Sequence, residues 1–458
     1  MAAYQLLIIG GGLSGIAAGI RAARFGLKTL ILEQHHIPGG LNSYYHRQGR
    51  LLETGLHAMT NFAPPGDKQA PLNRLFRQLR LSRKQLAVHQ QIGSEIRFAG
   101  RSLHFTNDIA VLEEAIAREF PEAIDRFRLL RQKVAAYDPF TAVPWRSARG
   151  FLAEHLRHPL LTDMLLLPLM VYGNAEEHDM DLGQFVIMFR AIFEEGFFRP
   201  GGTMREFLDL LVRQFREFGG ELRYRSPVAA VETDGDRAVG VRLESGEQLT
   251  AEAVLSTAGM PETMRLAGWE GDRARYAGRM SFMETISFVP RAALASLDSA
   301  RTILFYHHGS RFNYRRPDDF LDLSWGVICF PDNFSGLAPE DSAQIRVTNA
   351  ANYPLWKGLA AEIYGPAKER WAQAAIAASE EIIGNYRSSI VYQDSFTPVT
   401  IERFTRKAEG AVYGSGIKVR DGVTPWVNLF IAGTDQGYLG IVGAMLSGIT
   451  IVNQHVLR

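Results

Sequence analysis

The start of the chain alternates between short apolar runs and glycines. Tyr4 to Ile9 is almost wholly apolar, which predicts a buried strand. An alanine-rich segment from Ser14 to Phe25 predicts a helix, and Gly26 suits its C-terminus. Lys28 to Leu32 predicts a second buried strand, which ends at Glu33. A strand, a helix and a strand in this order predict a parallel sheet.

Helical and strand-rich segments alternate along the rest of the chain. Helical periodicity covers residues 72–135, 151–195 and 357–385, and residues 203–218 form an amphipathic pattern. Short strands separated by turn signals are expected at Glu221–Tyr224, Val228–Glu232, Ala238–Leu243, Gln248–Ala251 and Ala253–Ser256. Residues 281–330 are strand-like and rich in aromatic side chains, and Asn428–Ala432 predicts a last buried strand before a glycine-rich turn and a helix. We therefore expect an interleaved α/β architecture, with one domain built from the start, middle and end of the chain.

Composition narrows the classes of function. Apolar residues make up 46% of the 458 residues and charged residues 22%, which is ordinary for a soluble globular protein. The net charge of +1 gives no reason to expect nucleic acid as a partner. The single cysteine, Cys329, excludes a disulfide within the chain and makes a cysteine-based metal site implausible. No secretory signal is visible, and the apolar run from Met164 to Tyr172 is too short to span a bilayer, so we expect a cytoplasmic protein.

The glycines after the first strand form the central motif, Gly10-x-Gly12-x-x-Gly15. Its context is that of a dinucleotide-binding fingerprint, because it lies between an apolar strand and a helix, and Glu33 closes the next strand. Gly10 permits the tight turn, Gly12 lets the backbone approach a pyrophosphate, and Gly15 allows close packing of helix on strand. Ser14 lies in the first helical turn, where free N–H groups favour an anion. Glu33 is expected to accept hydrogen bonds from ribose hydroxyls.

A second glycine pair favours FAD over NAD. Gly39 and Gly40 follow Glu33 after five residues, and this extension resembles the long FAD fingerprint of the amine oxidase and phytoene desaturase superfamily. Glycine permits close backbone approach to phosphate and ribityl oxygens, where a Cβ would intrude. The chain has no second fingerprint of this kind with a strand and helix around it, so a separate NAD(P)H domain is not expected.

Further motifs resemble the retinol saturases, carotenoid isomerases and phytoene desaturases within that superfamily. They are Leu32-Glu33-Gln34-His35, Thr54-Gly55-Leu56-His57, Phe198-x-Pro200-Gly201-Gly202, Phe396-Thr397-Pro398 and Gly433-x-Asp435-x4-Gly440-Ile441-Val442-Gly443-Ala444. The resemblance implies a Rossmann-type FAD-binding domain interleaved with a mixed α+β substrate domain. The boundaries that follow are residues 1–70, 200–275 and 395–458 for the FAD-binding domain, and 71–199 and 276–394 for the substrate domain with a helical cap.

The same resemblance implies further cofactor contacts. Val228 would present backbone groups to the adenine. Gly433, Asp435 and the turn at Gly440, Ile441 and Val442 would lie near the pyrophosphate, the ribityl chain and the isoalloxazine. Two positions depart from the family pattern: Leu41-Asn42 follow the glycine pair where relatives often carry Arg, Lys or Cys, and Tyr438-Leu439 stand where desaturases carry Pro-Gly.

A flavin carries the redox chemistry itself, so the protein needs only to position the substrate, exclude water and in some cases donate a proton. The motifs place Glu53, His57 and Tyr438 near the flavin. His57 is either a proton donor or a buried, hydrogen-bonded histidine, Glu53 is either a participant or part of a solvated hairpin, and Tyr438 is either a participant or a pocket wall. The adjacent pairs His35-His36 and His307-His308 lack metal-ligand spacing on a helix, so no metal site is predicted.

The middle segments suggest a hydrophobic substrate. They are dense in large apolar residues, of which Phe189 and Phe193 lie one helical turn apart and are the candidates for a tunnel wall. The leading hypothesis is an enzyme that saturates, desaturates or isomerises carbon–carbon double bonds in an isoprenoid or polyene such as a carotenoid or retinoid; the sequence does not identify the electron partner. An amine-oxidase-type enzyme is the alternative, although neither an active-site lysine nor an aromatic cage can be located from sequence. A non-catalytic prenyl-binding protein of the same fold, like the Rab GDP-dissociation inhibitors, is a third.

One segment suggests contact with a membrane. From Leu72 to Leu86, apolar residues recur at helical spacing among arginines. Such a helix either lies on the inner surface of a membrane, as a peripheral attachment, or packs its apolar face on the core.

Overall fold

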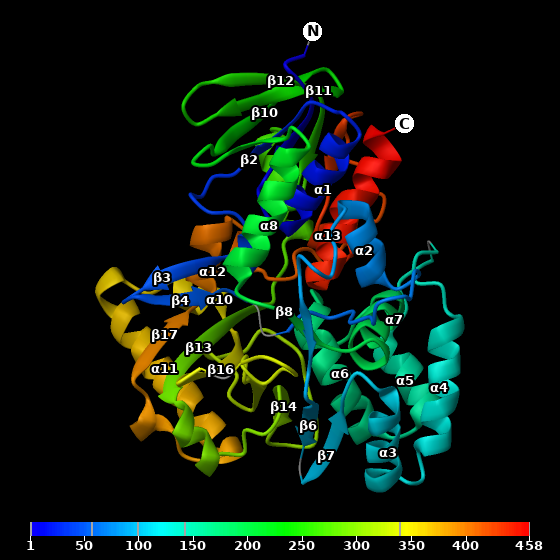
Figure 1. The fold of residues 1–458 in the computed structure, drawn as a ribbon, viewed down its shortest axis with the longest axis vertical. Helices are drawn as coiled ribbons and strands as arrows, with labels where there is room; N and C mark the ends of the chain where they lie inside the picture. Colours follow the sequence, from blue (N-terminus) through cyan, green and yellow to red (C-terminus); the bar gives the residue numbers. More distant parts are fainter. Residues whose placement is uncertain (1, 56–57, 99, 142, 339, 458) are drawn as a thin grey trace.

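The structure, a computed structural model, describes residues 2–55, 58–98, 100–141, 143–338 and 340–457. Two large sheets organise it. The first sheet lies in the upper part of Figure 1, near both termini, and the second lies below it. Strands of the first sheet are β1 (Tyr4–Ile9), β2 (Thr29–Leu32), β9 (Glu221–Arg223), β10 (Val228–Asp234), β11 (Arg237–Leu243), β12 (Gln248–Ser256) and β18 (Leu429–Ile431).

The core of the first sheet is parallel. β9, β2, β1, β12 and β18 lie side by side in this order and all run in the same direction. β12 is longer than its parallel neighbours, and its first residues pair antiparallel with β11, which in turn pairs with β10. Gln248–Ser256 is thus one strand, where the sequence predicts two. Strands from the start, the middle and the end of the chain therefore lie side by side in one sheet.

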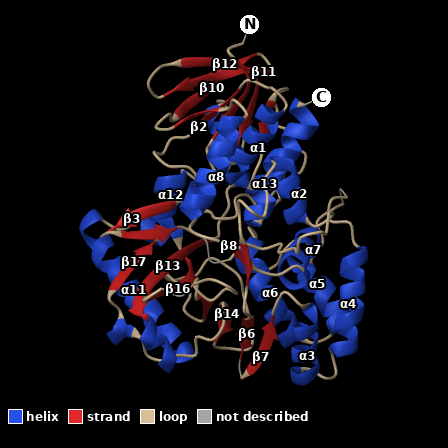
Figure 2. Ribbon diagram, in the orientation of Figure 1, coloured by secondary structure: helices blue, strands red, loops and turns tan. Residues whose placement is uncertain are grey.

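Helices α1 (Leu13–Arg24), α8 (Met204–Glu217) and α13 (Gly440–Ile451) cover this sheet, with α1 in contact with both of the others (Figure 2). α8 begins with a capping box, in which the side chain of Thr203 accepts from the N–H of Glu206 and the Glu206 carboxylate accepts from the N–H of Thr203. Its apolar side packs on the core through Phe207, Leu211 and Phe215. The start of α1 and the start of α13 are thereby held beside the carboxyl ends of the parallel strands.

The second sheet forms the other half of the molecule. Its order is β17–β13–β16–β15–β14–β6–β7. The strands are β6 (Ser94–Phe98), β7 (Arg101–Phe105), β13 (Ser281–Pro290), β14 (Ile303–His307), β15 (Trp325–Cys329), β16 (Ser342–Ala351) and β17 (Tyr392–Phe396). Two small antiparallel pairs complete the fold: β3 (Tyr44–Arg47) with β4 (Arg50–Glu53), which form a hairpin, and β5 (Val88–Gln90) with β8 (Phe198–Pro200), which come from distant parts of the chain.

Helices flank the second sheet on its two sides (Figure 1). They are α3 (Ile109–Glu119), α4 (Ile124–Ala136), α5 (Ala148–Leu156), α6 (Pro159–Gly173), α7 (Leu182–Phe189), α10 (Tyr353–Lys357), α11 (Ala361–Ile383) and α12 (Pro398–Thr405). Two further helices belong to the first half of the molecule: α2 (Pro71–Leu79) packs against α1 and α13, and α9 (Met260–Leu266) lies beside β10. The prediction of helix throughout residues 72–135 is wrong between 88 and 105. There, Ile96, Phe98, Leu103 and Phe105 point into the core and form strands instead.

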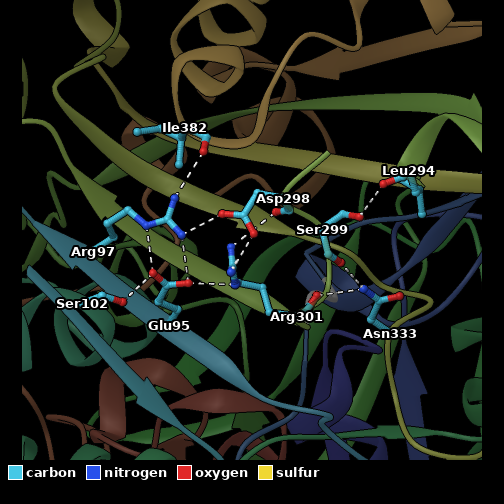
Figure 3. Close-up of polar contacts among 9 residues, drawn as sticks. All are labelled: Glu95, Arg97, Ser102, Leu294, Asp298, Ser299, Arg301, Asn333 and Ile382. Carbon is cyan, nitrogen blue, oxygen red and sulfur yellow. Dashed lines mark hydrogen bonds and ion pairs between the residues drawn. The ribbon is translucent and has the colours of Figure 1, made fainter. Parts of the chain in front are cut away.

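A network of charges fastens the edge of the second sheet (Figure 3). Arg97 and Arg301 both pair with Glu95 and with Asp298, at 2.8 Å in each case. Burial would raise the pKa of Glu95, but hydrogen bonds from Arg97 and Ser102 and the charge of Arg301 lower it below its usual value. The network joins β6 to the segment before β14 and, through the carbonyl of Ile382, to α11.

The amphipathic segment at α2 packs inward. Leu72, Leu75, Phe76 and Leu79 are buried in the same core cluster as α1 and α13, and Arg83 lies over the ring of Phe76. This helix therefore offers no apolar face to a membrane. Within the described ranges, no helix combines the length and apolar character needed to cross a bilayer.

Candidate functional site

The turn after β1 leaves open space beside one glycine. Gly10 has φ +101°, which favours glycine, and a Cβ on Gly15 would lie 2.1 Å from the carbonyl oxygen of Gly10. Gly12 has an ordinary extended conformation, and a Cβ there would meet no atom within 4 Å. Gly10 and Gly15 are therefore required by the fold, whereas Gly12 borders the space where the sequence predicts a pyrophosphate.

The start of α1 has the properties of an anion site. Among the described residues no side chain caps this helix, so its first N–H groups lack the usual side-chain acceptor there. The hydroxyl of Ser14 is buried in the first turn and has no hydrogen-bond partner among the described residues. A phosphate placed here would accept hydrogen bonds from the hydroxyl of Ser14 and from the first backbone N–H groups of α1. These features fit the pyrophosphate of FAD.

Glu33 lies against this turn. Its carboxylate accepts from the N–H groups of Gly11, at 2.7 Å, and His35, at 2.8 Å. Burial raises the pKa of Glu33, while these backbone donors oppose the rise. The carboxylate is thus fixed beside the glycines at the end of β2, as the fingerprint predicts, and Glu33 lines the large cavity described below.

The second glycine pair, Gly39 and Gly40, contacts the first glycine turn. The N–H of Gly39 donates to the carbonyl of Gly11 at 2.9 Å, and both Gly39 and Gly40 have positive φ. A Cβ on Gly40 would lie 3.4 Å from the Cα of Gly12. The two turns therefore lie together on one side of the cavity, which Gly40 lines.

In the motif near the end of the chain, from Gly433 to Ala444, some residues line the cavity and others lie behind them. Gly440 and Ile441, at the uncapped start of α13, line the cavity. Val442 is fully buried behind them, and Gly433 donates its N–H to Ser447 at 2.7 Å. Asp435 does not line the cavity, since its carboxylate is buried and accepts from protein N–H groups.

Val228 begins β10 and is largely buried in a separate core cluster, outside the cavity lining. Its predicted contact with adenine stays a prediction.

Of the three predicted catalytic residues, two are placed by the structure. Glu53 is buried and pairs with Arg199 at 2.7 Å, and it accepts the N–H of Met204 at 2.6 Å, so it anchors the start of α8. Tyr438 stacks on Phe140. Neither residue lines the cavity. His57 lies outside the described residues.

The predicted tunnel residues lie in the core. Phe189 and Phe193 are fully buried, and their rings meet edge to face with centroids 5.3 Å apart. Phe189 also contacts Phe127 and Phe185. Neither Phe189 nor Phe193 lines the cavity, so the structure places the candidate substrate wall elsewhere.

A cavity of about 440 Å³ extends from Glu33 and Gly40, beside the glycine turns, to the second sheet. Its volume is in the range of ligand pockets. The residues of its wall away from the glycines are mainly apolar and aromatic: Val171, Tyr172, Phe282, Phe396, Val412 and Tyr413. These come from α6, β13, β17 and the segment after α12. The sequence marks two of them: Phe396 belongs to a family motif, and Phe282 belongs to the aromatic-rich segment 281–330.

Two aromatic residues shape this wall. Tyr172 packs against Phe197 and Phe305, and its buried hydroxyl has no hydrogen-bond partner among the described residues. The hydroxyl of Tyr413 donates to the carbonyl of Val171. The wall is therefore apolar apart from a free hydroxyl at Tyr172.

Charged residues also line the cavity, at a different place. Arg47 of β3 pairs with Asp394 of β17 at 3.0 Å, and Lys368 of α11 lies 4.0 Å from the same carboxylate. The hydroxyl of Tyr45 donates to Asp394 at 2.9 Å. No motif marks Lys368, because a single lysine on a helix is ordinary in a sequence.

A buried carboxyl group supports another wall residue. Thr60 lines the cavity, and the next residue, Asn61, donates its side-chain N–H to Glu195 at 2.8 Å. Burial raises the pKa of Glu195 to about 7, and the charge of Asp67 adds to the rise.

This pKa predicts a loss of stability as pH rises. The folded state holds the proton of Glu195 more tightly than the unfolded state, so the free energy of unfolding falls between about pH 4.5 and pH 7. We expect Glu195→Gln to be more stable than the wild type at pH 8, by at most about 3 kcal/mol, and similar to it at pH 4. Denaturant unfolding at both pH values measures this difference. Exposed Glu114→Gln is the control, and an equal effect of both variants would contradict the expectation.

Comparisons with known proteins agree with this geometry. The profile of the family "Flavin containing amine oxidoreductase" matches residues 13–454. Prolycopene isomerase of Daucus carota is 22% identical over 90% of this chain and 72% of its own length. A lycopene-forming phytoene desaturase of Paracoccus is 25% identical over 56% of this chain and 54% of its own. The crystal structure of an oxidoreductase from Methanosarcina mazei, 14% identical, has a TM-score of 0.69 and covers 98% of this chain and all of that one, which confirms the predicted fold class.

Proposed function

Because the chain belongs to the flavin containing amine oxidoreductase family and is an FAD-dependent oxidoreductase, we propose that it acts on carbon–carbon double bonds of a hydrophobic isoprenoid or polyene. The reaction is a saturation, a desaturation or a cis–trans isomerisation. One observation carries the proposal: the cavity begins at Glu33 and Gly40, beside the FAD-type glycine turns, and extends to an apolar, aromatic wall. The curated relatives named above, which act on carotenoids by their names, support it.

Each part of the cavity has a task in this proposal. Gly12 and Ser14, at the start of α1 next to the cavity, hold the pyrophosphate side of FAD together with Gly40. Glu33 holds the ribose, and Gly440 and Ile441 lie along the remainder. Bound FAD supplies exchange of hydride or electrons with a carbon atom beside it. The apolar wall excludes water and orients a substrate that has few polar groups.

The cavity disfavours the amine alternative. An amine substrate is a cation at neutral pH, but Arg47 and Lys368 outnumber their neighbour Asp394 at the charged part of the wall. A lysine and several aromatic residues do line the cavity, so the features expected of an amine oxidase are not wholly absent. The sign of the local charge nevertheless opposes a cationic ligand. The non-catalytic prenyl-binding alternative is excluded, because the chain is an FAD-dependent oxidoreductase.

Product analysis tests the reaction class. Oxidised and reduced protein are mixed anaerobically with carotenoids and retinoids, and the products are separated by chromatography. We expect at least one polyene to change its number or geometry of double bonds. If every polyene were inert while an amine bleached the flavin, amine oxidation would replace this proposal.

A substitution tests the apolar wall. Phe282 of β13 lines the cavity and packs edge to face with Tyr413. We expect Phe282→Ser to lower kcat/KM for the polyene by about 10- to 100-fold, because an aromatic contact of about 1.5–3 kcal/mol is lost. FAD content, read from the visible spectrum, should stay unchanged. Leu129→Ser, on the exposed face of α4, is the control, and equal turnover in both variants would count against this wall.

Membrane attachment is not part of this proposal, because the apolar face of α2 that suggested it is buried.

A further inference from the structure

The charged part of the cavity wall is built from three elements that lie far apart in the sequence. β3 contributes Tyr45 and Arg47, α11 contributes Lys368, and β17 contributes Asp394. Figure 1 shows these elements together beside the second sheet, below the parallel sheet. The side chain of Arg47 is 58% exposed, so the cavity reaches the surface here.

The hydrogen bonds at this place leave one cation without a close partner. Asp394 already accepts from Arg47 at 3.0 Å, from the hydroxyl of Tyr45 at 2.9 Å and from its neighbour's N–H at Ser395. The ammonium of Lys368 lies 4.0 Å from the same carboxylate and makes no hydrogen bond to the described residues. Three N–H donors of Lys368 therefore remain to be satisfied by a ligand or by water.

The charges sum to one positive unit. Arg47 and Lys368 carry two positive charges and Asp394 one negative charge. Of the other two carboxylates that line the cavity, Glu284 is paired with buried Arg346, and Glu33 lies at the glycine turns, where backbone N–H groups donate to it. Glu369, next to Lys368 in the chain, is exposed and does not line the cavity.

Lys368 is also partly removed from water. Its side chain is 23% exposed, and burial lowers its pKa, an effect that the charge of Asp394 opposes. A cation in this position costs solvation free energy unless an anion approaches it. The charge, the free donors and the open cavity all favour an anionic group of a ligand.

We propose that the substrate carries one carboxylate at the end of its apolar chain, and that Lys368 and Arg47 bind this group. The inference rests on the proposed function, since it names the polar end of the polyene substrate. A carboxylate brings one negative charge, which balances the site, whereas a phosphate would leave excess negative charge near Asp394. Cationic donors are also well suited to a carboxylate, with which they form charge-assisted hydrogen bonds.

A fixed carboxylate has a consequence for selectivity. Apolar contacts with the wall around Tyr172 and Phe282 distinguish poorly between the double bonds of a polyene, because neighbouring double bonds have nearly the same shape. Once the carboxylate is held at Lys368, the distance along the chain decides which carbon lies beside the flavin.

Binding of three retinoids with the same polyene tests the proposal. Retinoic acid, retinol and retinyl phosphate are each equilibrated by dialysis with the FAD-loaded protein. We expect the acid to bind about tenfold more tightly than the alcohol and more tightly than the phosphate. Lys368→Gln should remove most of the preference for the acid over retinol, because the remaining cation, Arg47, is already paired with Asp394. Lys133→Gln, which removes an exposed lysine on α4, should change neither affinity.

The outcomes separate this inference from the proposed function. Equal binding of acid and alcohol, or an acid preference that persists in Lys368→Gln, would overturn the carboxylate site while leaving a polyene enzyme. Tighter binding of the phosphate would replace the carboxylate by a phosphate. If none of the retinoids bound and an amine bleached the flavin, the proposed function itself would fail, and the inference with it.

Discussion

Gly12→Val is expected to fold normally and to purify with less than about a tenth of the FAD of the wild type. The backbone at Gly12 is extended, with φ −70° and ψ 171°, so valine adopts it without strain. A Cβ there would touch no protein atom within 4 Å. The new side chain would instead occupy space beside the uncapped start of α1, where the pyrophosphate must approach.

Visible absorbance after purification measures FAD content, and circular dichroism and thermal unfolding report on the fold. Gly365→Val is the matched control, because Gly365 is exposed on α11 and a Cβ there also meets no described atom within 4 Å. Gly15→Val should behave differently from both, since its Cβ would lie 2.1 Å from a backbone oxygen and disturb the fold. Full FAD occupancy in folded Gly12→Val would place the cofactor elsewhere.

The second large effect is expected on stability. Asp435→Ala should lower the free energy of unfolding by about 3–5 kcal/mol, the usual cost of removing one partner of a buried ion pair. Asp435 is 1% exposed and accepts from the N–H groups of Met260 and Ser415, at 2.5 and 2.9 Å. Burial alone would raise the pKa of Asp435, but the charges of Lys407 and Lys418 and the two donors lower it below its usual value.

The variant would remove the buried anion that Lys407 and Lys418 share, and would leave them only the weaker influence of Glu262 and Glu176. Lys407 lies 3.8 Å from Asp435, and the buried ammonium of Lys418 donates to the carbonyl of Thr434 at 3.1 Å. The surroundings fit the carboxylate closely, because a Cβ on Gly414 would lie 1.8 Å from it. Urea denaturation measures the loss, with exposed Asp236→Ala as the control. A loss below about 1 kcal/mol would be close to the effect of a surface substitution. It would show that the lysines find another partner.

The parallel sheet and the glycine turns could be predicted from local sequence. A short apolar run, three spaced glycines and Glu33 belong to one continuous segment, and each residue type has a direct physical reason. β12 was harder. Its first half alternates, as suits an exposed antiparallel pair with β11, and its second half is continuously apolar between parallel neighbours, so one strand resembles two.

β6 and β7 were missed for a different reason. Arg97, Arg101 and His104 alternate there with buried apolar residues, but arginines and leucines just before this segment favour helix, and the helical pattern was extended too far. Tertiary pairing with β14 decides the outcome, and local sequence does not contain it.

The cavity wall could not be read from composition. Phe189 and Phe282 are both large, apolar and largely buried, yet only Phe282 borders the cavity. Which aromatic residues enclose empty space depends on how distant segments pack. The same holds for Lys368, whose relation to Arg47 and Asp394 appears only when β3, α11 and β17 come together.

The order of strands in the parallel sheet determines when the chain can first hold its cofactor during synthesis. Ile9 of β1 pairs with Ser256 of β12, and Ser256 pairs with Ile431 of β18. The glycine turn emerges from the ribosome early but waits for partners at the far end of the chain, on the order of tens of seconds at the usual rate of translation. Until then the apolar strands β1 and β2 lack their full set of neighbours, and this period is when a nascent chain is open to aggregation and to chaperones.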